Sequence, residues 1–180
     1  MSRSRWVSLF AAGLLALTAC SDATTPSGPS PASVIPPAKI TLSGVVSATG
    51  RDPLNALVLT TEDGSRITLL VSAETSALGA LAGAGVDVRG RWDGDQSFVV
   101  DEFIVREVGG TPVLDGILVE QLFSDLGDDP VIGYVLRLRD GSAASLIDPS
   151  PELLTHIGAR MWVRLDDAGE ARDFGIIDSY

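Results

Sequence analysis

Few residues in this sequence could support catalysis, and they do not form a recognisable catalytic set. The 180 residues include one histidine, His156, and one cysteine, Cys20. A serine nucleophile would need His156 as its base, yet the sequence contains no nucleophile-elbow motif. We therefore interpret His156 as a surface or half-buried helix residue and predict no catalytic residues.

Acidic turns are the candidates for a metal site. They are Asp93-Gly94-Asp95, residues 125–129 (DLGDD) and Asp166-Asp167. None has the ligand spacing and closing glutamate of a calcium loop, and Asp and Gly are also ordinary turn residues. Paired carboxylates for glycoside hydrolysis have no motif that would place them. We predict no metal or cofactor site, with weak calcium binding at these turns as the alternative.

Two alternating stretches, residues 86–92 and 160–165, carry the side chains best suited to binding. Because successive side chains of a strand face opposite sides, the first stretch should point Val86, Val88 and Trp92 inward. The outward sets are then Asp87, Arg89 and Arg91 in the first stretch and Arg160, Trp162 and Arg164 in the second.

A tryptophan flanked by arginines could stack a sugar ring or anchor a partner protein. We therefore predict a binding face that includes Trp162, Arg164, Arg89 and Arg91. The alternative is that Trp162 packs against the other half of the chain while the arginines pair with nearby carboxylates.

Cys20 has the best-defined sequence context. Arg3 and Arg5 are the only charges before it, and the apolar run that follows them is too short to span a bilayer comfortably, as in a secretory signal. The residues Leu17-Thr18-Ala19-Cys20 resemble the lipobox of bacterial lipoproteins at all four positions. The resemblance implies cleavage between Ala19 and Cys20 and acylation of Cys20. The alternative is an ordinary signal peptide with an incidental cysteine.

Lipid on Cys20 would fix the protein to a membrane. Each buried methylene contributes roughly 0.8 kcal/mol, so several chains on one residue would hold it almost permanently. Ser21 follows the cysteine, and in Gram-negative lipoproteins this favours sorting to the outer membrane. We predict a lipid-anchored protein of the bacterial cell envelope.

The net charge argues against nucleic acid as a partner. Without residues 1–19, 13 − 2 = 11 basic residues remain against 24 acidic ones, a net charge of about −13. Such a body repels phosphate backbones and anionic head groups. With Cys20 modified, no thiol remains for a disulfide, a metal site or a nucleophile.

Composition divides the rest of the chain into a tether and a folded body. Residues 20–37 hold five prolines and no periodic apolar pattern, which predicts a stiff, extended tether. From residue 38 onward, short alternating runs predict strands. Asp63-Gly64 predicts a tight hairpin turn, residues 74–83 a short helix ended by glycine, and Asp101-Glu102 a β-bulge.

The expected order of three strands, a helix and two strands occurs twice. The matching residues of the two halves are Leu42 and Leu114, Gly44 and Gly116, Asp63-Gly64 and Asp140-Gly141, Gly83 and Gly158, and Val88 and Val163. The separation between matching residues changes only in expected loops, where insertions are tolerated. We predict a duplication, with one domain over residues 38–108 and another over 111–180.

Strand order and helix position resemble the OB-fold, a five-stranded Greek-key barrel. The repeats are also similar to short exported bacterial domains of unknown function. We predict an all-β fold with short helices, arranged as tandem OB-like barrels; one two-sheet sandwich is the alternative. For function we expect a non-enzymatic binding or assembly module for an envelope protein or glycan. A structural or accessory lipoprotein is the alternative, and an envelope hydrolase is less favoured.

Overall fold

The structure of the protein is a computed structural model that describes residues 38–50, 56–124 and 131–178. The expected signal segment 1–19, Cys20 and the tether up to residue 37 lie outside the described residues. The same holds for the acidic stretch 125–129.

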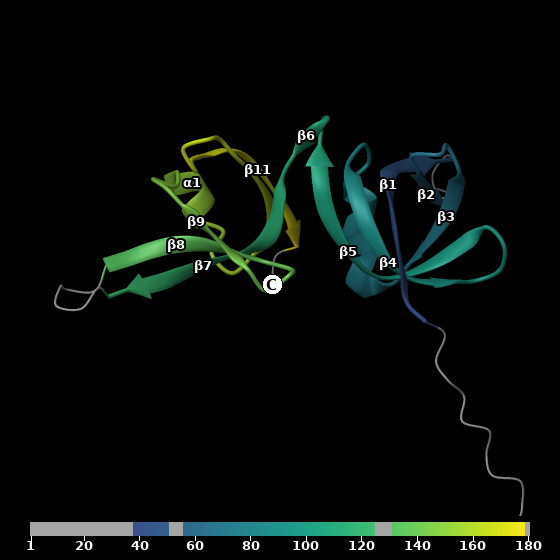
Figure 1. Cartoon of the computed structure of the whole chain (residues 1–180), viewed down its shortest axis with the longest axis horizontal. Coiled ribbons are helices and arrows are strands. Elements are labelled where there is room, and N and C mark those ends of the chain that lie inside the picture. The colour runs from purple at the N-terminus through teal and green to yellow at the C-terminus, as the bar shows by residue number, and fades with distance from the viewer. Residues whose placement is uncertain (1–37, 51–55, 125–130, 179–180) are drawn as a thin grey trace, which may run out of the picture. The chain divides into compact units, whose positions relative to one another are not determined.

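The first six strands form one sheet, drawn blue to teal in Figure 1. Its hydrogen-bonded order is β3-β2-β1-β4-β5-β6. Strand β3 also pairs in parallel with β5, from Thr68 opposite Ser97 to Val71 opposite Val100, so five strands close into a ring. The elements are β1 (Ile40–Thr49), β2 (Ala56–Thr60), β3 (Arg66–Val71), η1 (Ala73–Ala80), β4 (Gly85–Trp92), β5 (Ser97–Val108) and β6 (Thr111–Pro112).

The second sheet, green to yellow in Figure 1, has the order β11-β10-β7-β8-β9, and all of these pairings are antiparallel. Among the described residues, its ends meet only through an isolated parallel bridge between Ile147 and Glu170. The elements are β7 (Leu114–Phe123), β8 (Val131–Leu138), β9 (Ala143–Leu146), α1 (Pro151–Leu154), β10 (Arg160–Leu165) and β11 (Ala171–Asp178).

The structure contains a hairpin turn, a β-bulge and a short helix at the predicted places. Gly64 has a φ of 83°, which supplies the positive dihedral of the turn between β2 and β3, so the predicted hairpin is confirmed. The predicted bulge is also confirmed, because Arg89 pairs with Glu102 and Gly90 with Val100, which leaves Asp101 as the extra residue. The expected helix is present as the 3-10 helix η1.

Each sheet encloses its own buried cluster. The cluster of the first sheet includes Leu59, Val88 and Phe98, and that of the second includes Leu136 and Met161; all five are 0% exposed. The all-β class and its barrel-like character are therefore confirmed.

The burial predicted for Trp92 is wrong. Val86 and Val88 are buried, as expected, but Trp92 is 44% exposed. It is the last residue of β4, and its ring contacts the buried Phe98 edge-on, with the two centroids 5.4 Å apart. The strand alternation places this side chain toward the inner side, but at the end of the strand no further layer of core side chains covers it.

Candidate functional site

Trp162 and Arg164, predicted to belong to a binding face, lie on β10 among residues of the first sheet. Trp162 is half-buried and packs against the core of the first sheet, and it lines a small groove with Ala84 and Val108. The Arg164 guanidinium donates to the carbonyl oxygen of Val108 at 2.9 Å and lies 3.5 Å from Asp173. These contacts are those of the alternative in which Trp162 packs against the other half of the chain.

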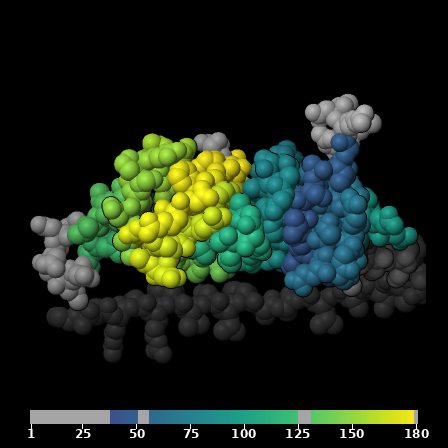
Figure 2. All heavy atoms as spheres, turned by 90° about the horizontal axis from the view of Figure 1, so that it is seen from above, coloured from purple at the N-terminus to yellow at the C-terminus, as the bar shows by residue number. Residues whose placement is uncertain are grey.

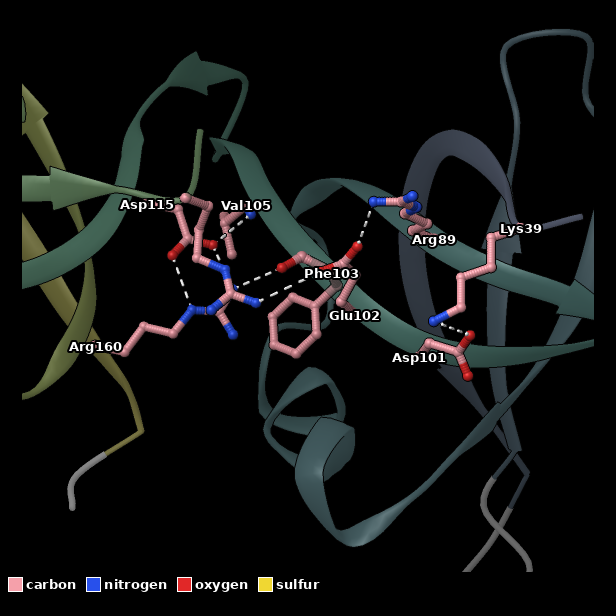
Figure 3. A network of polar contacts seen from close by, with 9 residues as sticks. Lys39, Arg89, Asp101, Glu102, Phe103, Val105, Asp115 and Arg160 are labelled. Carbon is pink, nitrogen blue, oxygen red and sulfur yellow. Dashed lines mark hydrogen bonds and ion pairs between the residues drawn. The ribbon is translucent and has the colours of Figure 1, made fainter. Parts of the chain in front are cut away.

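Arg160 was expected to face outward with Trp162, and this is wrong. Its residue is 8% exposed, and its guanidinium donates to both carboxylate oxygens of Asp115, at 2.9 and 2.6 Å. It also donates to the carbonyl oxygen of Phe103 at 2.7 Å and lies over that residue's ring, as Figure 3 shows. The Asp115 carboxylate accepts a further bond from the Val105 amide at 2.8 Å.

This buried pair joins the second sheet to β5 of the first. A fully hydrogen-bonded carboxylate and guanidinium can be buried, because each partner compensates the desolvation of the other. Strand β11 adds to the same junction: Ile177 belongs to the first sheet's core, and the yellow atoms of β11 adjoin blue-teal atoms of the first sheet in Figure 2. Arg160 is therefore a structural residue of this junction.

Arg89 and Arg91 lie on the outer face of β4, as predicted, and both are paired. Arg89 Nη1 lies 3.0 Å from Glu102, and Arg91 Nη1 lies 3.2 Å from Asp101. Three further cations join them. They are Lys39, 3.1 Å from Asp101; Arg106, 2.7 Å from Asp87; and Arg139, 3.9 Å from Glu102.

We call these five cations and three carboxylates the arginine face. Its formal charge is 5 − 3 = +2, on a chain whose net charge is −11. Burial alone would raise the pKa of Asp87, but the Ser43 hydroxyl and the Arg106 guanidinium outweigh it and lower that pKa. Asp87 is thus favoured in its charged form, and the face presents arginine side chains that are half exposed, such as Arg89 at 55% and Arg106 at 59%. A polar cleft of about 510 Å³ lies over Arg89, Arg106 and Arg139.

His156 and Asp166 have structural neighbours. The His156 ring is tilted against Phe174, with centroids 6.0 Å apart. Asp166 accepts backbone bonds from Ala168 and Glu170 and pairs with Arg172, so its carboxylate closes a turn. Within the described ranges, no three His, Cys, Asp or Glu residues come together in a way that could hold a metal ion.

Sequence reasoning missed a cleft of about 740 Å³ at one end of the first sheet. It lies between the β2–β3 turn and the turn that follows β4, and Trp92 lines it. The signal that could have identified it is the position of Trp92, which is the last residue of a strand and directly precedes the turn Asp93-Gly94-Asp95.

Comparisons with protein families, with curated proteins and with solved structures found no match for this chain. In the part of the chain that the structure describes, no helix has the length and apolar character needed to cross a membrane.

Proposed function

We propose that this protein is a lipid-anchored, non-enzymatic binding module of the bacterial cell envelope, held through acyl chains on Cys20. The support for the anchor is the signal-like N-terminus and the match of Leu17-Thr18-Ala19-Cys20 to a lipobox. Ser21 favours the outer membrane. A Cys20→Ala variant should leave the membrane fraction and become soluble in the envelope; retention of the variant in membranes would contradict the anchor.

We also propose that the body consists of OB-like barrels. The ring of the first sheet runs β1-β2-β3-β5-β4 and back to β1, with η1 between the third and fourth strands, which is the arrangement expected of that fold. The second sheet has the same neighbour order, and α1 lies between its third and fourth strands.

A duplication is supported by backbone hydrogen bonds that recur at matching positions of the sequence repeat. Each helix is followed by a glycine of positive φ whose amide donates to the first strand, while that strand donates back to the next residue. In the first sheet these bonds link Val46 with Gly83 and Ala84; in the second they link Leu118 with Gly158 and Ala159.

The observation that carries the binding function is the arginine face. Half-exposed arginines gathered on a rigid sheet can form bidentate bonds to carboxylates and are enriched among residues that dominate binding energy. Their own carboxylates hold them in place, so little side-chain freedom is lost on binding. The rest of the chain is strongly acidic, so this face is the one best suited to an acidic partner. We therefore propose that it binds an envelope protein through a carboxylate-rich surface.

The test removes charge from this face while preserving the fold. Arg89→Gln with Arg106→Gln should abolish crosslinking of the partner in the native host, as measured by mass spectrometry of crosslinked products. Arg172→Gln is a control outside the arginine face, because Arg172 is 60% exposed and is also ion-paired, with Asp166 and Glu170.

The partner captured by the wild-type protein and by the control should be lost from the double variant, and its binding should weaken with added salt. An unchanged set of crosslinked proteins, with the double variant folded, would overturn the assignment of the arginine face.

A further inference from the structure

The cleft beside Trp92 has a chemistry unlike that of the arginine face. Its volume of about 740 Å³ lies within the range typical of small-ligand sites, roughly 300–1,000 Å³. We propose that this cleft is a second binding site, which takes a neutral oligosaccharide with one sugar ring stacked on Trp92.

Trp92 supplies a large apolar surface whose orientation is fixed. Trp92 is 44% exposed, and its ring stands almost perpendicular to the ring of Phe98, at 82°. Phe98 is 0% exposed and lies directly opposite Trp92 in the β4–β5 pairing. The tryptophan is therefore anchored on a buried side chain while part of its surface faces the cleft. Such a platform binds at low cost in conformational entropy.

The opposite wall is the β2–β3 turn, which is held rigid by Asp63. The Asp63 carboxylate accepts bonds from the Thr61 hydroxyl, from the Ser65 amide at 3.0 Å and from the Ser65 hydroxyl at 3.1 Å. Glu62, within this turn, and Arg66, the first residue of β3, also line the cleft. The Trp92 ring and the β2–β3 turn are therefore both held in place by contacts within the protein before a ligand binds.

Polar side chains that line the cleft match the hydroxyl groups of a sugar. Glu62 and Asp95 supply acceptors, Arg66 supplies donors, and the Gln96 amide supplies both. None of these four side chains makes an ion pair or a side-chain hydrogen bond with another described residue. They can therefore donate to and accept from ligand hydroxyls without breaking a hydrogen bond or ion pair to another described residue.

The charge of the cleft disfavours an anionic ligand. The cleft holds three carboxylates, Glu62, Asp63 and Asp95, against one cation, Arg66, which gives 1 − 3 = −2. An anionic polymer such as nucleic acid or a sulfated glycan would be repelled. A neutral sugar ring presents C–H groups to an aromatic face and hydroxyls to carboxylate and amide groups, and this combination fits Trp92 and its polar surroundings.

The second sheet offers no matching cleft residues at the equivalent positions of the repeat. There, Asp167 stands in the place of Trp92, Arg139 in that of Glu62 and Ala143 in that of Arg66. The proposed sugar site is therefore specific to the first sheet. It is also independent of the arginine face, so each proposal can fail without the other.

The test uses the full mature chain with the Cys20→Ala substitution, titrated with cellohexaose, maltohexaose and chitohexaose and followed by calorimetry. A heparin hexasaccharide and hexauridylate serve as anionic controls. At least one neutral oligosaccharide should bind, and neither anionic control should. Trp92→Ala should weaken that binding about tenfold or more, a change of about 1.4 kcal/mol, whereas Trp92→Phe should restore part of it.

Two further variants separate loss of the site from loss of the fold. Gln96→Ala leaves the Trp92–Phe98 contact in place and should weaken sugar binding several-fold while the unfolding midpoint stays unchanged. The double variant Arg89→Gln with Arg106→Gln should bind the sugar as the wild type does. The proposal is overturned if none of the three neutral oligosaccharides binds at millimolar concentration, if folded Trp92→Ala binds equally well, or if the anionic controls bind instead.

Discussion

The two sheets share a strand order but differ in how they close. In the first sheet, β3 and β5 pair from Thr68 to Val71 and complete a ring. In the described part of the second, the corresponding ends meet only where Ile147 bridges Glu170. An open sheet leaves backbone groups unpaired along its edges, whereas a closed ring does not. The first sheet is therefore the more self-sufficient of the two.

The second sheet, which is nearly open, is stabilised by packing against the first sheet. Asp115 and Arg160 are buried against β5, and Trp162 and Ile177 pack on the first sheet's core. Asp115 directly precedes Gly116 of the repeat, and the residue in the same place before Gly44 is Ser43. Among the described residues, the Ser43 side chain hydrogen-bonds only to Asp87, at an exposed position. The same position in the proposed repeat thus has a junction role in one sheet and a surface role in the other.

The largest expected effect is on the separated halves. A fragment of residues 38–112 contains the whole ring and should unfold cooperatively by circular dichroism. A fragment of residues 113–180 should show no cooperative transition, because its sheet is nearly open and its junction residues lose their packing. Cooperative unfolding of the second fragment alone would show that the single bridge is sufficient closure.

Breaking the junction should have the next largest effect. Asp115→Ala leaves Arg160 buried without its carboxylate and the Val105 amide without an acceptor, which should cost about 3–5 kcal/mol in the free energy of unfolding. Ser43→Ala at the matching position removes one exposed hydrogen bond and should cost less than about 1 kcal/mol. Urea denaturation measures both changes.

A double variant shows whether Asp115→Ala destabilises the protein because it leaves a buried charge unpaired or because it removes a specific attraction. Replacing both partners, as Asp115→Leu with Arg160→Met, removes the buried charges together and should recover much of the lost stability. Equal destabilisation by Asp115→Ala and Ser43→Ala would mean that the two sheets are supported in the same way.

Local chemistry is what made parts of the fold predictable. The Asp63-Gly64 turn and the bulge at Asp101 depend on neighbouring residues and on strand alternation, which the sequence displays directly. Arg160 could not be placed in this way, because its burial depends on Asp115 and on the Phe103 carbonyl, both of which lie far from it along the chain.

The binding residues show the same limit. Alternation correctly assigned Arg89 and Arg91 to an outer face, yet the convergence of Arg106 and Arg139 on that face depends on strand pairing and on a loop of the second sheet. The exposure of Trp92 was not predicted, because alternation specifies on which side of a strand a residue lies and not whether the core extends to the end of that strand.

Alanine substitution at two matching glycines, one in each sheet, compares how well the closed and the nearly open sheet tolerate a local displacement of their strands. Gly44 and Gly116 each lie against the carbonyl of the neighbouring strand, at Thr60 and Arg137, so an added Cβ would force the strands apart. Alanine at either position should cost about 1–3 kcal/mol, with the larger cost at Gly44 because a closed ring cannot shift. In Gly116→Ala, hydrogen exchange should also quicken at the Ile147 amide, which bonds to Gly169. Equal costs and an unchanged exchange rate would contradict this difference.

The smallest expected effect concerns the hairpin turns of the two sheets. The Thr61 hydroxyl and the Ser65 amide and hydroxyl lower the pKa of Asp63 from its ordinary value of 3.8, whereas Ser142 alone supplies the corresponding bonds that lower the pKa of Asp140. A lowered carboxylate pKa stabilises the fold above the unfolded-state value, and that contribution is lost as the pH falls through the folded-state value. Asp63→Asn should therefore lower the urea midpoint more than Asp140→Asn at neutral pH, and both differences from wild type should shrink below pH 3.8. Differences that persist unchanged into acid would mean that the turns depend on geometry rather than on charge.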